Sequence, residues 1–259
     1  MIKEYSNGES FIKDNSSFLD LNRYMSALIC LDAKFLGDVD KKNYCLKSSI
    51  NDKQLLGLKL EPYKLLLYGD IECLSELLDY LESNDYECDG IQCSMDLGIE
   101  LVNKRGYIET LGMDFMEAKE KTIESSTLVS KLSLDDVKEI YDLSISFMSD
   151  CGLSDKVKEE NIIKRLSNYR VIKKDGRIIS MAGLSIDTKE SMRITYVYTR
   201  PEYRGKGYAK KVVNYIKNEI IDMGLIATLN VDRKNPISNH LYESLGFKKV
   251  FSQGVYIKE

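Results

Sequence analysis

Apolar positions in the second half of the chain switch repeatedly between strand-like and helix-like spacing. Strands and helices of an alternating α/β domain are predicted there. The predicted strands are 128–132, 170–179 as a hairpin turning at Asp175-Gly176 and running on through 181–186, then 191–199, 225–231 and 247–257. The predicted helices are 134–148, 157–166, 206–223 and 237–245. Ser133 and Gly224 suit the ends of two of these helices.

The first half is less regular. Its pattern predicts helices over 18–35 and 71–81, and strands within 44–60 and over 63–68. Asn51-Asp52 reads as a turn inside the first strand pair.

Composition supports a soluble globular protein with room for two domains. The chain has 259 residues, of which 43% are hydrophobic and 30% charged. Residues 1–120 hold 13 Lys/Arg against 23 Asp/Glu, a net charge of −10, whereas residues 121–259 hold 24 against 18, a net charge of +6. The basic second half therefore suits an anionic ligand.

Several classes of protein are disfavoured by the composition. No apolar run reaches the length of a membrane span, the N-terminus lacks the apolar core of a signal peptide, and no basic block with aromatics indicates nucleic acid. Six cysteines and a single histidine favour reduced thiols and no metal site. We expect a cytoplasmic protein without a membrane partner.

The most informative segment is Arg204-Gly205-Lys206-Gly207-Tyr208-Ala209, between the strand 191–199 and the helix that follows. Glycines let backbone N–H groups approach a ligand at the positive end of a helix, and the two cations add charge. A phosphate or pyrophosphate is the expected ligand. The Walker and dinucleotide patterns do not fit, because Tyr-Ala follows the second Gly and Lys210 occupies the third Gly position.

This loop resembles the acyl-CoA pyrophosphate loop, Arg/Gln-x-x-Gly-x-Gly/Ala, of the GNAT N-acetyltransferase superfamily. Residues 235–247, which end in Tyr-Glu-Ser-Leu-Gly-Phe, resemble the second half of the same family's site. The resemblance runs from about Tyr196 to Phe247. It implies the GNAT acyl-CoA N-acyltransferase fold, an α/β (α+β) arrangement with a mixed central sheet flanked by helices. It also implies acetyl-CoA as cosubstrate.

The resemblance further implies roles for individual residues. The backbone of Val197, Tyr198 and Thr199 would bond the pantetheine arm and thioester where this strand splays from its neighbour. Arg204, Gly205, Lys206, Gly207, Tyr208 and Ala209 would hold the pyrophosphate, and Asn235, with Ser238 beside it, would contact the pantetheine arm. Tyr242 would protonate or steady the leaving thiolate. Glu190 and Glu202 are candidates for the general base by sequence proximity alone, and His240 is expected on an exposed helix face.

A weak repeat relates the two halves of the chain. Residues 101–107 resemble residues 241–247, but Gly69-Asp70-Ile71-Glu72-Cys73 stands where a phosphate loop would lie. We therefore predict two GNAT-like domains in tandem. The first, 1–120, is a degenerate domain without the CoA loop; the second, 126–259, is catalytic, with a linker region over 117–130.

The predicted function is transfer of an acetyl group from acetyl-CoA to a primary amine by direct attack. Three alternatives stay open: the donor carries another acyl group, the acceptor is a hydroxyl, or the protein is a CoA-binding regulatory module without turnover. The amine could belong to a small molecule or a peptide, and a homodimer is also open. The motifs identify the cofactor and leave the acceptor unassigned.

Overall fold

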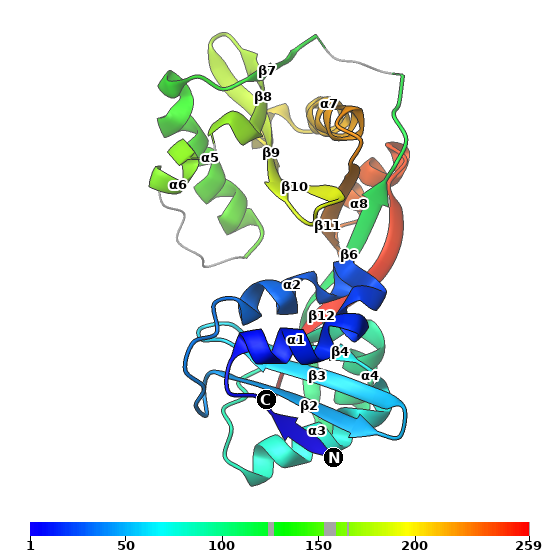
Figure 1. Cartoon of the computed structure of the whole chain (residues 1–259). Coiled ribbons are helices and arrows are strands. Elements are labelled where there is room, and N and C mark those ends of the chain that lie inside the picture. Colours follow the sequence, from blue (N-terminus) through cyan, green and yellow to red (C-terminus); the bar gives the residue numbers. More distant parts are fainter. Residues whose placement is uncertain (124–126, 153–158, 165, 259) are drawn as a thin grey trace. The chain divides into compact units, whose positions relative to one another are not determined.

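The computed structural model describes residues 1–123, 127–152, 159–164 and 166–258, and these form two compact units (Figure 1). Unit 1 comprises Met1–Phe115, Asp232–Lys234 and Phe251–Glu259; unit 2 comprises Met116–Val231 and Asn235–Val250. In the described residues, strand pairing follows the order β1-β2-β3-β4-β5-β12-β6-β11-β10-β9-β8-β7. The predicted mixed sheet flanked by helices is confirmed.

Unit 1 contains three consecutive antiparallel strand pairings followed by a parallel one. Its elements are β1 (Ile2–Glu4), α1 (Gly8–Leu19), α2 (Arg23–Ala33), β2 (Tyr44–Ile50), β3 (Lys53–Lys59), β4 (Leu65–Gly69), α3 (Leu74–Ser83), β5 (Ile91–Ser94), α4 (Met95–Arg105) and most of β6 (Tyr107–Ala118). Side chains alternate across the sheet, so Leu65 and Leu67 pack toward α3 and α4, whereas Leu66 and Tyr68 pack toward α1 and α2. Helices thus cover both faces.

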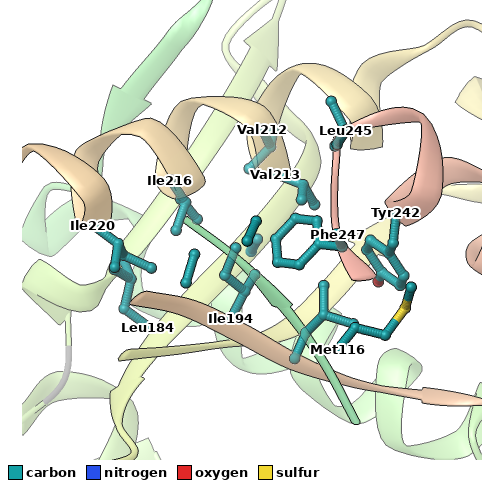
Figure 2. Packing of buried hydrophobic residues seen from close by; sticks show 14 of the residues in the cluster. Met116, Leu184, Ile194, Val212, Val213, Ile216, Ile220, Tyr242, Leu245 and Phe247 are labelled. Atoms are coloured by element: carbon teal, nitrogen blue, oxygen red, sulfur yellow. The ribbon is translucent and has the colours of Figure 1, made fainter. Parts of the chain in front are cut away.

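Unit 2 has the same layering. Its elements are β7 (Val129–Lys131), α5 (Val137–Asp150), α6 (Glu159–Lys164), β8 (Tyr169–Lys174), β9 (Arg177–Ile186), β10 (Ser191–Thr199), α7 (Tyr208–Asp222), β11 (Ile226–Asp232) and α8 (Pro236–Ser244), with the start of β12 (Lys248–Lys258). Figure 2 shows the core on one face, where the apolar side of α7 meets the sheet, Tyr242 of α8 and Leu245 just after that helix. Ile140, Leu143 and Ile162 form a second core, on the other face.

Most elements predicted for unit 2 are confirmed within about two residues. The hairpin turns at Asp175 and Gly176, which both have positive φ (52° and 78°). Ser133 takes part in a capping box with Asp136, and Gly224 follows α7 with a φ of 75°. The predicted helix 157–166 lies partly outside the described residues, where α6 occupies 159–164.

Predictions for unit 1 were less complete. The single helix expected over 18–35 is wrong: α1 ends at Leu19, and Asn22 starts α2 by accepting a hydrogen bond from the Met25 N–H. A side-chain cap of this kind breaks a run of apolar positions that looks continuous in sequence. Glu117 and Ala118, expected in a linker, end strand β6, and 124–126 of that region lie outside the described residues.

The C-terminal strand β12 supplies unit 1 with core side chains. Residues 253–256 of β12 pair antiparallel with residues 91–94 of β5. Tyr256 is 2% exposed, and a Cβ on Gly98 would lie 1.9 Å from the Tyr256 ring. Helix α4 can therefore pack this closely only because residue 98 has no side chain.

We predict that Tyr256→Ala lowers the free energy of unfolding by about 3–5 kcal/mol, because it leaves a cavity under α4. Denaturant unfolding measures the loss, and Tyr63→Ala, a change at a 55% exposed ring of the same unit, is the matched control. A loss for Tyr256→Ala no larger than that of the control would contradict this assignment of β12.

Candidate active site

Strand β10 carries a β-bulge at its centre. Thr195 pairs with Gly183 and Tyr198 with Met181, so Tyr196 and Val197 together oppose a single residue of β9. Tyr196 has a φ of 50°. The bulge reverses which face of the sheet the odd- and even-numbered side chains of β10 occupy. Ile194 and Val197 both pack on the core beneath α7, whereas Tyr196 and Tyr198 pack on the α5 side.

β10 separates from its parallel neighbour β11 early along its length. The ladder between these two fully described strands joins Ser191–Arg193 to Ile226–Thr228 and ends there. We call this last pair, Arg193 and Thr228, the vertex of the splay. Beyond it, the facing backbone N–H and C=O groups of the two strands need other hydrogen-bond partners. The splay implied by the family resemblance is therefore present, and it opens toward the loop at 204–209.

A buried carboxylate fastens the vertex. Asp187, whose side chain is 3% exposed, forms an ion pair with Arg193 and accepts a 2.9 Å hydrogen bond from Thr228 Oγ1. Arg193 and Thr228 are the last paired residues of the two strands. The same carboxylate thus holds both strands at the point from which they diverge.

The loop presents an open helix N-terminus. The Lys211 N–H donates a hydrogen bond to the Gly207 carbonyl (3.2 Å), the first i to i−4 bond of α7. The N–H groups of the residues before Lys211 therefore have no acceptor within the helix itself. Gly205 and Gly207 have φ values of 75° and 76°, and a Cβ on either would meet no atom within 4 Å. The backbone of residues 205–210 can therefore be approached by an anion.

The cations of the loop also make contacts inside unit 2. Arg204 donates through Nε to the Thr199 carbonyl (2.9 Å) and pairs with Asp150 (2.6 Å), at the end of α5. Lys206 donates to the Glu202 carbonyl (3.1 Å). Arg204 therefore ties the loop to the end of β10, and these contacts of the two cations involve none of the backbone N–H groups of residues 205–210.

Helix α8 places the remaining predicted residues. Asn235 Oδ1 accepts the Ser238 N–H (3.1 Å) and caps the helix, as sequence reasoning allowed. Tyr242 is 7% exposed, and its ring packs against that of Phe247 (Figure 2). The two ring centroids are 6.0 Å apart in an edge-to-face arrangement. His240 lies on the exposed face, as predicted.

Burial raises the pKa of the Tyr242 phenol well above its ordinary value, and Cys151 at the end of α5 adds a smaller effect. The phenol therefore keeps its proton at neutral pH. Among the described residues, no group forms a hydrogen bond with its hydroxyl. Tyr242 can thus donate a proton to a ligand.

The contacts of Glu190 and Glu202, the two candidates for the general base, lie away from the splay. Glu190 lies in the β9–β10 turn, before the paired end of β10. Glu202 is exposed beside the loop and pairs with Arg177 at 3.5 Å. Strand β10 itself has no carboxylate.

The corresponding loop of unit 1 is closed. A Cβ on Gly69 would lie 2.3 Å from the Gln54 carbonyl oxygen. The Asp70 N–H donates to that carbonyl (2.8 Å), and the Asp70 carboxylate accepts the Gln54 N–H (2.9 Å). The backbone of this loop is thus bonded to β3, and the loop carries two acidic residues, Asp70 and Glu72.

Sequence reasoning missed Asp187, Arg193, Thr228 and Tyr196. No local motif distinguishes them, because their roles depend on strand register and on a bulge. The described residues contain no cluster of three or more metal-ligating side chains, and no helix among them is long and apolar enough to cross a bilayer.

We predict that Asp187→Asn lowers the free energy of unfolding by about 3 kcal/mol, because it removes the buried negative charge that pairs with Arg193. Chemical denaturation measures the change. Asp222→Asn, which removes an exposed ion pair with Lys121, should cost less than about 1 kcal/mol. Equal losses for the two variants would show that the vertex pair has no special importance.

Part of the sequence is similar to known proteins. A model of the acetyltransferase (GNAT) family matches residues 136–247. The β-lysine N(6)-acetyltransferase of Methanosarcina mazei is 30% identical over 81 residues. Those residues make up 30% of this chain and 30% of that protein, so the match spans under a third of the relative.

Solved structures resemble the chain over its whole length. A GCN5-related N-acetyltransferase from Sphaerobacter thermophilus has a TM-score of 0.69 at 13% identity, covering 100% of this chain and 95% of that one. A GNAT-family acetyltransferase from Colwellia psychrerythraea has a TM-score of 0.64 at 12% identity, covering 99% and 98%. At such identities the likeness concerns the fold, and the predicted GNAT fold is confirmed. Residues 136–247 therefore match the GNAT acetyltransferase family in sequence, and the chain has the GNAT fold.

Proposed function

We propose that unit 2 transfers the acetyl group of acetyl-CoA to a primary amine. The observation that carries this proposal is the splay of β10 from β11, which opens beside the uncovered helix N-terminus at 205–210. The first feature offers unpaired backbone groups to an extended ligand, and the second offers N–H donors to its pyrophosphate. The name of the Methanosarcina mazei relative supports an amine acceptor.

The pyrophosphate would lie on Gly205, Lys206, Gly207, Tyr208 and Ala209, with Arg204 holding the loop against β10. The pantetheine arm would follow the free edge of β10 at Val197, Tyr198 and Thr199, near Asn235 and Ser238. The Thr199 carbonyl already accepts from Arg204, so we assign the arm chiefly to the other groups on this edge.

In the reaction, the amine nitrogen forms a bond to the thioester carbonyl carbon and the C–S bond breaks. Backbone N–H groups at the bulge would stabilise the oxyanion of the tetrahedral intermediate. The amine would pass its proton to water, Tyr242 would donate its own to the departing thiolate, and the Tyr242 oxygen would regain a proton from water. Because burial raises its pKa, Tyr242 stays protonated at neutral pH and so carries a proton for the thiolate.

We propose that unit 1 is a degenerate GNAT-like domain that does not bind the pyrophosphate. The bonds between Asp70 and Gln54 and the close approach at Gly69 support this role. We keep 1–120 and 126–259 as the two sequence domains, with the C-terminal half of β12 completing the first.

Gly207→Glu should abolish binding of acetyl-CoA, because a carboxylate on the loop repels the pyrophosphate and the positive φ disfavours a side chain. Isothermal titration of the full chain measures the affinity. Gly176→Glu, at the positive-φ hairpin turn, is the matched control and should bind normally. Retained binding by Gly207→Glu would remove the loop from the cofactor site.

Tyr242→Phe should lower kcat about tenfold to a hundredfold while the affinity for acetyl-CoA changes by less than about twofold. Release of CoA in the presence of an amine measures turnover. Because its pKa is raised, the phenol of the wild type should cause no alkaline loss of rate below about pH 10. Unchanged turnover would contradict the role of Tyr242, and cofactor binding without turnover by the wild type would favour a regulatory module.

A further inference from the structure

The parallel strands β4 and β5 of unit 1 separate early, as β10 and β11 do in unit 2. Their ladder ends after its second pair, Leu66 with Gln92. The next bond of such a ladder would run from the Ser94 N–H to the Leu67 carbonyl. Residues 65–94 are all described, and these two groups have no partner in the ladder. Backbone groups at this point can therefore bond to a ligand.

A cavity lies at this separation, on the face of the sheet that α2 covers. Met25, Leu28 and Ile29 line it from the helix, and Leu66 and Tyr68 line it from β4. All of these lining residues belong to unit 1. The cavity therefore offers apolar contacts to a ligand that enters between α2 and the sheet.

Three polar but uncharged side chains line the same cavity, those of Gln92, Ser94 and Gln253. Ile91 and Cys93 pack into the core on the opposite face, so Gln92 and Ser94 point toward α2. Gln253 of β12 pairs directly with Ser94 and therefore shares its face. Within the described part of the chain, none of these three side chains forms a hydrogen bond.

The cavity has no charged lining residue among those that the structure describes. Its titratable residues are Tyr68 and Cys93, and burial raises the pKa of both, so both are neutral at pH 7. The loop that follows β4 adds the acidic residues Asp70 and Glu72, which would repel an anion. These features favour a neutral ligand over CoA or another phosphate compound.

We propose that this cavity of unit 1 binds a small uncharged carboxamide with a short aliphatic chain. A carboxamide both donates and accepts hydrogen bonds, as the side chains of Gln92 and Gln253 do, so ligand and protein can satisfy each other. The ligand carbonyl would also accept the Ser94 N–H that the ladder leaves without a partner. The aliphatic chain would pack against the α2 side chains. Unit 1 thus has a ligand site of its own.

Pentanamide, 2-hexanone and pentanoate have nearly the same shape, and their binding to the full chain tests this inference. The ketone lacks the N–H donors of the amide, and the carboxylate is charged. We expect pentanamide to bind about tenfold more tightly than either analogue, because only the amide matches the glutamines without a charge. Titration followed by backbone amide NMR measures the affinities and should show shifts at residues 66–68 and 92–94.

Gln92→Leu and Gln253→Leu should each remove most of the preference for the amide while changing the affinity for 2-hexanone by less than about threefold. Retained ketone binding also shows that these variants are folded. Gln54→Leu is the matched control, because Gln54 belongs to β3 of the same unit and does not line the cavity, and it should leave both affinities unchanged. Leu28→Ala, at a 40% exposed lining residue, should weaken both ligands by the same factor.

Equal affinities of the wild type for pentanamide and 2-hexanone would overturn the inference. Shifts confined to unit 2, or an unchanged preference for the amide in both glutamine variants, would do so as well. None of these outcomes depends on acetyl transfer by unit 2.

Discussion

The separation of β10 from β11 is the constraint on which the rest of the site depends. Parallel strands normally satisfy each other's backbone groups along their length, yet this pair stops at Arg193 and Thr228. Asp187 bonds to both of those residues from a buried position, so the vertex is fixed by a charge that is costly to leave unpaired. A ligand with amide groups can then complete the pairing that the strands lack.

The bulge in β10 determines which side chains lie on each of the two faces of unit 2. Because Tyr196 and Val197 share one partner position on β9, successive side chains of the strand change sides there. The face under α7 holds the buried phenol of Tyr242, and the α5 face holds the rings of Tyr169, Tyr196 and Phe147. The end of α5 contacts residues on the open side of the splay between β10 and β11. Arg204 ties the loop to α5 through Asp150, and Cys151 lies near enough to affect Tyr242.

Sequence reasoning was strongest where a local pattern has a local cause. The Asp175-Gly176 turn, the Ser133 cap and the strand–loop–helix around Gly205 and Gly207 follow from backbone preferences of a few residues, and the structure has them. The contacts of Asp187 and the parity change at Tyr196 were not predictable, because they depend on which strands pair and where pairing ends. The same reason hid the assignment of β12 to unit 1, since Tyr256 is far in sequence from Ile91 and Gly98.

Binding of acetyl-CoA along the splayed strand and the loop can be tested by hydrogen exchange of the backbone amides with and without the cofactor. We expect acetyl-CoA to slow exchange at residues 194–199 of the splayed strand and 205–210 of the loop, with no change at residues 69–73 of unit 1. Protection at 69–73, or none at the splay and the loop in the presence of saturating acetyl-CoA, would contradict it.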